Sequence, residues 1–373
     1  MRQRPDSGVA VWDLGVRAFH WLMVAAVVVS ALTGFVLGRT LLAWHLAAGV
    51  VVIVAIAWRV VWGAFGPTYA RFASFAYSPA AVLAHLRDAW RGGQHRHLGH
   101  NPLGAVMVFA LLAVLTAIVL TGTVALGGLL KQGPLRAFLS YAAGRQWIEI
   151  HNALAILLLA MIAGHLAGVA FESWRGRENL TTAMFTGRKP ALPPAETAKP
   201  ARANARAGLA LALGIVAAGA AGVAALAALP GRGVPPPTRD ATFDLQCGAC
   251  HLAFPPSVAP SATWNAILAD LQHHFGADAT LSGEQIADIR IWLDANSAEH
   301  WDTLASHLLR APAAGGSLRI TDTPGWRRLH RDIPSAVFGP KRLRRSDCAS
   351  CHADAADGRF APQDIAIPEA DEP

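Results

Sequence analysis

Cys247-Gly-Ala-Cys250-His251 and Cys348-Ala-Ser-Cys351-His352 share one pattern, and together they contain all four cysteines of this 373-residue chain. The spacing is that of covalent c-type haem attachment, in which two thiols bond to the haem vinyl groups and the adjoining imidazole ligates the iron. Two zinc-binding cysteine pairs are an alternative, but zinc requires no histidine after each second cysteine. A disulfide within either motif would close a strained loop, because only two residues separate the cysteines. We therefore expect two c haems, with His251 and His352 as proximal ligands.

The rest of the chain has the composition of a membrane protein, with 53% hydrophobic and only 15% charged residues. Five apolar stretches are long enough to cross about 30 Å of hydrocarbon at about 1.5 Å per residue. A proline-rich segment after the fifth stretch, at 235–237, marks a domain boundary. The first stretch lacks a convincing cleavage site, and we interpret it as a retained helix rather than a secretory signal. The expected spans are residues 16–37, 41–62, 102–125, 148–171 and 207–229.

Positive charge predicts the orientation, because cytoplasmic loops are enriched in Lys and Arg. The N-terminus and the loops at 59–96 and 175–206 hold most of these residues, whereas the opposite loops hold Arg39, Lys131, Arg136 and Arg145. The N-terminus is thus expected in the cytoplasm, and five crossings place the C-terminal part in the periplasm. Covalent haem attachment on the outer side of the bacterial inner membrane requires the same orientation. The net charge of +7 is then a consequence of topology and predicts no nucleic-acid partner.

Four histidines lie within the expected spans, where ionisable side chains are costly and tend to be functional. His151 and His165 are fourteen residues apart, which is about 21 Å along a helix and nearly four full turns. They therefore share one helical face. We expect His45 to lie at the same membrane depth as His151, and His20 at the same depth as His165. We expect two bis-histidine b haems, one near each membrane surface. The alternative is four separate hydrogen bonds to neighbouring helices.

Glycines near these histidines favour the haem interpretation, because a flat ring can approach a helix there; the same small residues also promote ordinary helix packing. Arg59 lies fourteen residues beyond His45, where it would pair with a haem propionate or simply anchor the helix at the cytoplasmic surface. The histidines at 85, 95, 97 and 100 are expected to be solvated loop residues. The glycines concerned are Gly34, Gly49, Gly164 and Gly168.

Residues 11–189 resemble the bacterial cytochrome b561 family, which includes hydrogenase-linked cytochrome b subunits. The family's four haem-ligand positions fall on the four membrane histidines. The resemblance thus implies a four-helix membrane bundle that binds haem b. The matching stretches are Val11-Trp-Asp-Leu14, Phe19-His20-Trp21, His45 with Gly49, Gly99-His-Asn-Pro-Leu-Gly104, His151, Gly164-His165, Arg177-Glu-Asn-Leu180 and Thr186-Gly-Arg-Lys189.

Residues 243–368 resemble a second family, the periplasmic dihaem cytochromes c. Its members donate electrons to a small monohaem, oxygen-binding cytochrome c. Residues 190–242, with the fifth helix, match neither family and are expected to act as a tether. The matching stretches, besides the two cysteine motifs, are His274-Phe-Gly276, Leu318-Arg-Ile-Thr-Asp-Thr-Pro324 and His330-Arg-Asp-Ile-Pro334.

The distal ligands of the c haems are inferred from a helical pattern. Residues 263–275 are predicted to form one helix that ends at Gly276, with an apolar stripe of Trp264, Ile267, Leu268, Leu271 and Phe275. His274 falls at the edge of that stripe, whereas His273 faces solvent. His274 is therefore the expected distal ligand of one haem and His330 that of the other. His300 and His307 are interpreted as surface residues that would serve only as substitutes.

The predicted fold is all-α: a membrane domain (1–189), a linker with the fifth helix (190–239) and a periplasmic dihaem domain (240–373). The expected function is electron transfer from membrane quinol, through two b haems and two c haems, to a periplasmic acceptor cytochrome. The bilayer and the quinone pool are the other expected partners. The chain contains no catalytic triad, paired-carboxylate site or nucleotide-binding loop, so an electron carrier is favoured over a stand-alone enzyme. The alternatives are a cytochrome subunit of an oxidoreductase such as a hydrogenase, and a haem enzyme acting on oxygen, nitric oxide or superoxide.

Overall fold

A computed structural model of the chain describes residues 8–38, 41–93, 97–190, 204–339 and 342–368. The chain divides into two compact units, which we describe separately. The first contains residues 1–38, 43–122 and 148–223. The second contains residues 39–42, 123–147 and 224–373. Helices α4 and α5 each lie partly in the first unit and partly in the second. The end of α4, the beginning of α5 and the loop between them belong to the second unit.

Five helices are long and apolar enough to cross a membrane, which confirms the expected number of spans. The first is α1 followed by one stretch of π-helix, and the fourth extends beyond its predicted range at both ends. The chain is a multi-pass membrane protein. The spans are Leu14–Val36 (α1, Leu14–Ala31, with the π-helix Leu32–Val36), α2 (Leu42–Phe65), α4 (Pro102–Leu129), α5 (Tyr141–Gly176) and α7 (Ala205–Ala227).

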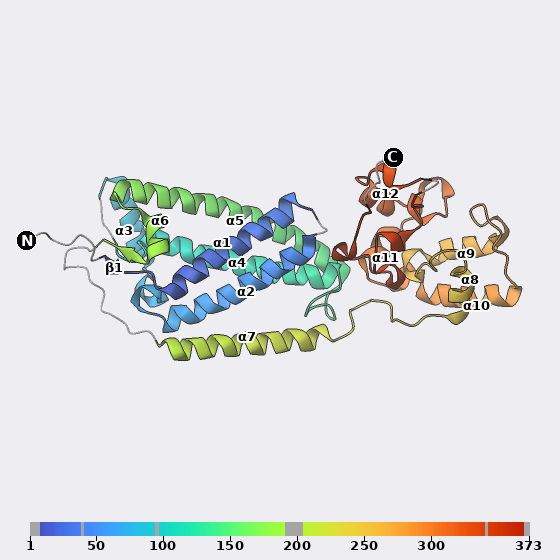
Figure 1. Cartoon of the computed structure of the whole chain (residues 1–373), viewed down its shortest axis with the longest axis horizontal. Helices are drawn as coiled ribbons and strands as arrows, with labels where there is room; N and C mark the ends of the chain where they lie inside the picture. The colour runs from blue at the N-terminus through green and yellow to red at the C-terminus, as the bar shows by residue number, and fades with distance from the viewer. Residues whose placement is uncertain (1–7, 39–40, 94–96, 191–203, 340–341, 369–373) are drawn as a thin grey trace, which may run out of the picture. The chain divides into compact units, whose positions relative to one another are not determined.

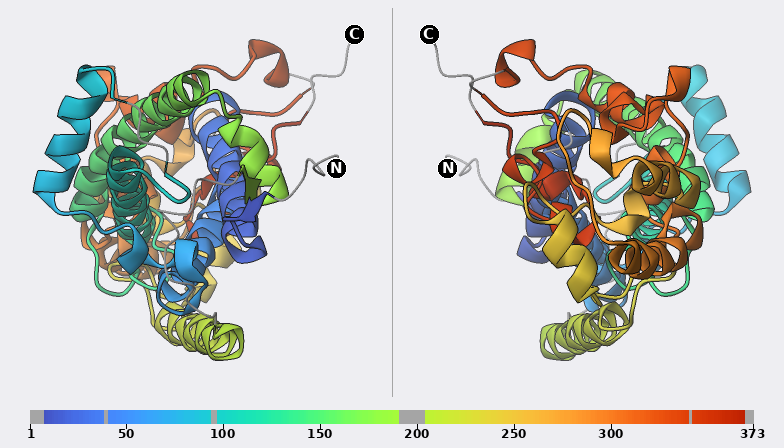
Figure 2. Two further views of the ribbon diagram at one scale, coloured as in Figure 1. Left: turned by 90° about the vertical axis from the view of Figure 1, so that its left-hand side faces the viewer. Right: turned by 90° about the vertical axis from the view of Figure 1, so that its right-hand side faces the viewer.

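Helices α1, α2, α4 and α5 form a four-helix bundle in the first unit, and α7 lies outside it beside α2 (Figures 1 and 2). All four contribute to one apolar core, as expected of helices that pack through large aliphatic side chains. The α7 helix begins against α2, because the amide of Asn204 donates to the carbonyl of Phe65 at 3.0 Å. The core residues are Met23, Ala26, Val52, Ala55, Leu115 and Leu158.

Short elements close the end of the bundle where α1 begins. Asp13 caps α1 by accepting from the amide of Gly15 at 2.8 Å, and it also accepts from Trp62 Nε1 at 2.8 Å. Strand β1 (Val9–Ala10) pairs antiparallel with β2 (Arg188–Lys189). Gly187 permits this approach, since its φ is +77° and a Cβ there would lie 2.5 Å from the carbonyl oxygen of Trp12. Helices α3 (Pro79–Trp90) and α6 (Leu180–Thr186) complete this end.

The second unit contains the two cysteine motifs among short helices and 3₁₀ turns. Its core packs Phe243 of α8 against Trp264 and Leu268 of α9 and against Ile289 and Leu293 of α10. The all-α fold class is confirmed, because β1 and β2 are the only named strands in the described part of the chain. The helices are α8 (Ala241–Cys247), α9 (Ser261–Ala269), α10 (Gly283–Asn296), α11 (Leu304–Leu309) and α12 (Pro324–His330).

The single helix predicted over 263–275 is wrong, because α9 ends at Ala269 and a 3₁₀ turn occupies Leu271–His273. Phe275 and Gly276 then adopt positive φ values of 52° and 99°. The apolar pattern predicted a helix beyond Ala269 because Leu271, although it lies in the 3₁₀ turn, packs on the same core as the residues of α9. Phe275 leaves the predicted stripe and instead lies under the guanidinium of Arg319, whose Cζ is 4.6 Å from the ring centroid.

Candidate functional site

His45 of α2 and His151 of α5 face each other inside the bundle, with ring centroids 6.1 Å apart. Two imidazoles on opposite sides of one metal ion have nitrogen–metal bonds of about 2.0 Å each, so their ring centroids lie about 6 Å apart. The rings are inclined at 70°. The first pair that the sequence analysis matched by depth is therefore brought together, at a spacing that fits an iron between the two rings.

Backbone carbonyls hold the Nδ1 atoms of both rings. His45 Nδ1 is 3.1 Å from the carbonyl oxygen of Ser30 and 3.2 Å from Thr33 Oγ1. His151 Nδ1 is 3.0 Å from the carbonyl oxygen of Ile118 and 3.4 Å from Thr121 Oγ1. When Nδ1–H donates to a carbonyl, the lone pair of Nε2 is free to bind a metal.

Thr33 and Thr121 were not found from the sequence, although a hydroxyl within an apolar helix is a usable signal. Thr33 lies in the π-helix that follows α1, and such local widening of a helix often occurs at functional sites. Both hydroxyls also bond to a carbonyl of their own helix, at 2.7 Å from Val29 and 2.8 Å from Ala117.

One of the four predicted glycines lies beside a candidate ligand, and so does one further glycine. A Cβ at Gly34 would lie 3.5 Å from His45 Cε1, and a Cβ at Gly122, which was not predicted, would lie 3.0 Å from His151 Cε1. A Cβ at Gly49 or Gly168 would meet no atom within 4 Å, and at Gly164 only Met107 Cε at 3.9 Å. Space beside a helix at these positions suits a flat ring.

The second membrane pair is less closely joined. No ring contact between His20 of α1 and His165 of α5 occurs in the described part of the chain. The ring of His20 meets Trp21 edge-on at 5.0 Å. Its Nδ1 is buried with no hydrogen-bond partner among the described residues.

The histidines of the loop before α4 do not all face solvent, which corrects the prediction for this loop. His100 contacts the rings of Trp12 at 4.7 Å and Phe75 at 4.5 Å. Burial, followed by the nearby charges of Arg59, Lys189 and His165, lowers the pKa of His100 to about 3. His85 and His97 also pack together, with ring centroids 5.7 Å apart, and His95 lies outside the described residues.

Arg59 is buried rather than anchored at a surface. Its side chain is 3% exposed, its Nη1 donates to the carbonyl of Ala70 at 3.0 Å, and its Cζ lies 4.4 Å from the ring centroid of Phe72. These contacts hold the guanidinium within the first unit. A buried cation of this kind is costly unless it serves a structural or binding role.

In the second unit, His251 and His274 stack with ring centroids 6.2 Å apart and planes inclined at 15°. His251 Nδ1 is 2.7 Å from the carbonyl oxygen of Leu252, which again leaves Nε2 available. His273 points elsewhere and bonds to Asp270 Oδ1 at 2.8 Å. The turn that replaces the predicted helix end thus directs His274, and not His273, toward the first cysteine motif.

His330 and His352 form an equivalent pair, with ring centroids 6.0 Å apart and planes inclined at 66°. His330 stacks on Trp326 at 4.2 Å, and its Nδ1 is 2.9 Å from the carbonyl oxygen of the same tryptophan. The second cysteine motif is held in a tight turn, since the amide of His352 donates to the carbonyl of Cys348 at 2.8 Å.

The ionisation of the candidate histidines in the second unit fits iron ligation. Burial, with the nearby charges of His251 and Arg319, lowers the pKa of His274. Burial also lowers that of His330 and, with the charge of His330, that of His352. Neutral imidazole is the form that binds a metal. All four cysteines are free, and burial raises the pKa of Cys247 and Cys348 to about 11.

A zinc site is not supported by the geometry. In the described part of the chain, no three His, Cys, Asp or Glu side chains converge as they would to hold a metal ion. Each motif instead has one histidine opposite its own, His274 for the first and His330 for the second.

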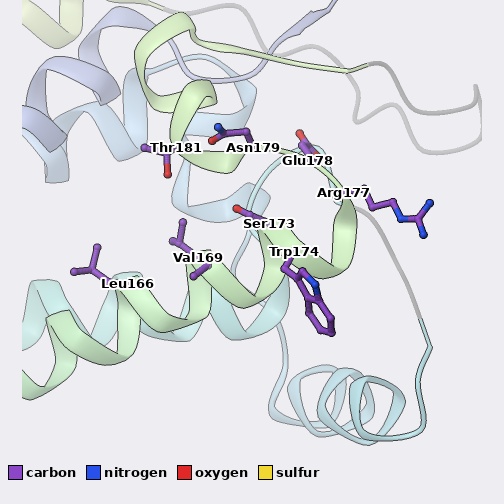
Figure 3. Close-up of a pocket in the computed structure, with 9 residues that line it drawn as sticks. Leu166, Val169, Ser173, Trp174, Arg177, Glu178, Asn179 and Thr181 are labelled. Carbon is purple, nitrogen blue, oxygen red and sulfur yellow. The ribbon is translucent and has the colours of Figure 1, made fainter.

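An open pocket of about 480 Å³ lies at the end of α5, beginning at the residue after His165. In Figure 3, Val169 and Ser173 project from α5 toward Thr181 of α6, whereas the side chain of Arg177 points away. One wall is apolar and the rim is polar. The lining residues are Leu166, Val169, Ala170, Ser173, Trp174, Arg177, Glu178, Asn179 and Thr181.

The fold and the opposed histidines define a class of protein: a membrane cytochrome joined to a c-type cytochrome. Residues 11–187 match the family described as prokaryotic cytochrome b561, and residues 243–360 match the family described as dihaem cytochrome c. The membrane part thus matches the first family and the C-terminal part matches the second. These families imply binding of haem b and haem c and a role in electron transfer.

Two curated relatives are similar to part of this chain. A probable Ni/Fe-hydrogenase B-type cytochrome subunit of Azotobacter vinelandii is 25% identical over 136 residues, and that of Azotobacter chroococcum mcd 1 is 24% identical over 136 residues. Each alignment covers 30% of this chain and 56% of the relative, so the chain spans about half the length of these curated relatives.

Two solved structures of dihaem cytochromes c are also similar. The structure from Shewanella baltica OS155 is 30% identical in sequence. The match covers 34% of this chain and 92% of the Shewanella chain, with a TM-score of 0.28. The structure from Rhodobacter sphaeroides is 34% identical in sequence. The match covers 33% of this chain and 98% of the Rhodobacter chain, with a TM-score of 0.28.

Proposed function

We propose that this protein transfers electrons from membrane quinol, through two b haems and two c haems, to a periplasmic acceptor cytochrome. The observation that carries the proposal is the presence of three opposed histidine pairs with ring centroids 6.0 to 6.2 Å apart. A haem held between two such imidazoles would supply one-electron redox chemistry. Because the two histidines would leave no open position on the iron, these sites would suit electron transfer better than reaction with a small molecule.

Three of the proposed ligand pairs are these opposed histidines, and the fourth, His20 with His165, rests on their matching depth in the sequence. His45 and His151 hold one b haem, and His20 and His165 hold the other. Cys247 and Cys250 attach the first c haem, with His251 proximal and His274 distal. Cys348 and Cys351 attach the second, with His352 proximal and His330 distal.

The protein's own groups prepare these sites. The carbonyls of Ser30, Ile118, Leu252 and Trp326 each lie 2.7 to 3.1 Å from the Nδ1 atom of a ligand. They orient each ring and increase its basicity as a ligand, as outer-shell acceptors generally do.

The orientation follows from the distribution of positive charge. Lys and Arg are concentrated at the N-terminus and in the loops at 59–96 and 175–206, which supports a cytoplasmic location for these segments. The C-terminal part, with both cysteine motifs, then lies in the periplasm. The protein would therefore carry electrons from the bilayer toward the periplasm.

The pocket at the end of α5 supports quinol as the donor. Its apolar wall is continuous with a membrane helix, and its rim carries a hydroxyl and an amide, from Ser173 and Asn179. A quinol has the same division into an apolar tail and a polar head group. His165, a proposed b-haem ligand, immediately precedes the first residue of the pocket.

The acceptor is inferred from the dihaem cytochrome c part. We propose a small, oxygen-binding monohaem cytochrome c, because the resemblance to the dihaem family implies such a partner. The basic segment 341–345 lies just before the second cysteine motif and would attract an acidic surface on the partner.

Rapid mixing of the purified protein with a short-chain quinol tests this proposal. Because the donor site lies in the membrane part, the b-type absorption should change first, the c-type absorption second, and an added acceptor cytochrome last. A protein that oxidises no quinol but is reduced by a soluble dehydrogenase would contradict the proposal. That result would support a cytochrome subunit of a larger oxidoreductase, which the similarity to hydrogenase cytochrome subunits favours as the second candidate.

A further inference from the structure

Within the second unit, the loop between α4 and α5 contacts the dihaem part through one carboxylate, that of Asp302. Its Oδ2 accepts from Lys131 Nζ and from the amide of Tyr141, each at 2.8 Å. Its Oδ1 bonds to His307 Nε2 at 2.8 Å. The ring of His307 in turn stacks on that of Tyr141, with centroids 4.1 Å apart and planes inclined at 11°. His307 is therefore no ordinary surface residue, in contrast to the prediction.

The lysine side of this contact is buried. Lys131 is 3% exposed, and its Nζ also donates to the carbonyl of Leu139 at 2.9 Å. Its backbone adopts a positive φ of 52°, a conformation that a side-chain-bearing residue retains only where surrounding contacts impose it. A buried ammonium without a carboxylate partner would be strongly destabilising, so Asp302 is required at this position.

The proline-rich tether runs through the same contact. The amide of Asp302 donates to the carbonyl of Gly233 at 2.7 Å, and the amide of Arg232 donates to the carbonyl of Arg136 at 2.9 Å. Gly233 has a φ of +63°, and a Cβ there would lie 2.5 Å from Asp302 Cβ. The loop, the tether and the start of α11 thus meet around one carboxylate.

The loop that carries this contact is joined to the membrane part by two helices, α4 and α5. Tyr141 is the first residue of α5, and His151 follows ten residues later, which is about 15 Å along the helix axis. Lys131 lies two residues after the end of α4, the helix whose Ile118 and Thr121 hold His151.

We propose that Asp302 docks the dihaem part onto the α4–α5 loop and is a positioning residue for electron transfer from the b haems to the c haems. The positioning role rests on the proposed function, whereas the docking role does not. Without docking, the tether alone would keep the two parts together, and the productive arrangement would be only one among many.

The test uses the full-length, haem-loaded protein in lipid nanodiscs with two readouts. Amide hydrogen exchange at Tyr141, Arg232 and Asp302 reports docking, because these amides donate the hydrogen bonds described above. The rate of c-haem reduction after the b haems receive electrons from an artificial donor reports positioning without using quinol. Asp302→Asn is compared with Asp332→Asn, which removes an exposed carboxylate bonded only to its neighbour Arg331 at 3.3 Å.

Asp302→Asn should lower the ratio of docked to undocked molecules roughly 100-fold, because removing one partner leaves the other charge buried and unpaired. Exchange at the three amides should rise by up to that factor and c-haem reduction should slow, while Asp332→Asn resembles the wild type. Adding Lys131→Met to Asp302→Asn should restore part of the protection, since no unpaired buried charge remains.

Unchanged exchange in Asp302→Asn would overturn the docking role. Increased exchange with an unchanged rate of c-haem reduction would overturn the positioning role alone. Direct reduction by dithionite and a full complement of c haem verify that the variant is folded. Failure of the wild type to oxidise quinol would overturn the proposed donor and leave both of these results intact.

Discussion

Single carbonyl groups determine which nitrogen of four candidate ligands can reach an iron. In His45, His151, His251 and His330, a carbonyl oxygen lies 2.7 to 3.1 Å from Nδ1. The acceptor selects the tautomer with a proton on Nδ1, so the Nε2 lone pair points into the site. The same pattern in the membrane and in the dihaem part indicates one solution to ligand orientation in two unrelated folds.

The pairing of membrane histidines predicts which substitutions remove the same haem. His45→Ala and His151→Ala should each abolish one b haem and leave the other, because each deletes one axial ligand of a shared site. The pyridine haemochrome content and the reduced b-type spectrum measure this loss, and the spectra of the two variants should coincide. His85→Ala, which changes a histidine outside the proposed sites, is the control. Different residual spectra would show that these two residues do not share a haem.

Residue types could be predicted here, but their acceptors could not. A histidine in an apolar helix, or after Cys-x-x-Cys, is recognisable because few other roles justify it. The carbonyls of Ser30 and Ile118 carry no such signature, since every residue has one. His100 was misjudged for a related reason: a polar loop sequence does not reveal that Trp12 and Phe75 pack around it.

At the scale of elements, the end of a short helix decides which of two adjacent histidines faces the first cysteine motif. The apolar spacing of Trp264 and Leu268 predicts α9 correctly, because both are buried in the core. It cannot predict that the helix stops at Ala269, since Asp270 leaves the helical region with a φ of −139° and a ψ of 61°. The 3₁₀ turn nonetheless places His274 opposite His251. The sequence had favoured His274 for a different reason, namely its position at the edge of the apolar stripe of one continuous helix.

Substitution of these two histidines should therefore have opposite outcomes. His274→Ala should leave the first c haem five-coordinate, so that the reduced protein binds carbon monoxide at one haem per chain. His273→Ala should bind none, because its side chain is exposed and bonds to Asp270. Carbon monoxide difference spectra of the dithionite-reduced proteins measure both. Binding by the wild type or by His273→Ala would contradict the assignment and favour a haem enzyme.

For the whole molecule, the five spans and both haem-binding parts were predictable because each is encoded locally, by hydropathy or by a short motif. The contact between Lys131 and Asp302 was not, since the two residues are 171 positions apart and neither belongs to a motif. Lys131 was counted as one of few positive charges in its set of loops. Its burial shows that this charge serves a contact rather than topology.

The charge on Asp302 also predicts how docking depends on pH. Burial alone would raise the pKa of Asp302, but the hydrogen bonds from Lys131, His307 and the Tyr141 amide together hold this pKa below its ordinary value of 3.8. A carboxyl group with a lower pKa in the docked state stabilises docking above the ordinary pKa and loses that effect as the pH falls through the lowered one. The contribution of Asp302 should thus be constant above about pH 5, begin to decline near about pH 4 and disappear only below the lowered pKa.

The difference in Tyr141 amide exchange between the wild type and Asp302→Asn, corrected for intrinsic exchange at each pH, measures this contribution. It should be large and constant from neutral pH to about pH 5, because Asp302 remains ionised throughout that range. It should then decrease as protonation neutralises the wild-type carboxyl and makes the two proteins equivalent. A difference that vanished near pH 6 would assign the effect to a histidine instead, and His307, which shares the carboxylate, would be the residue to substitute next.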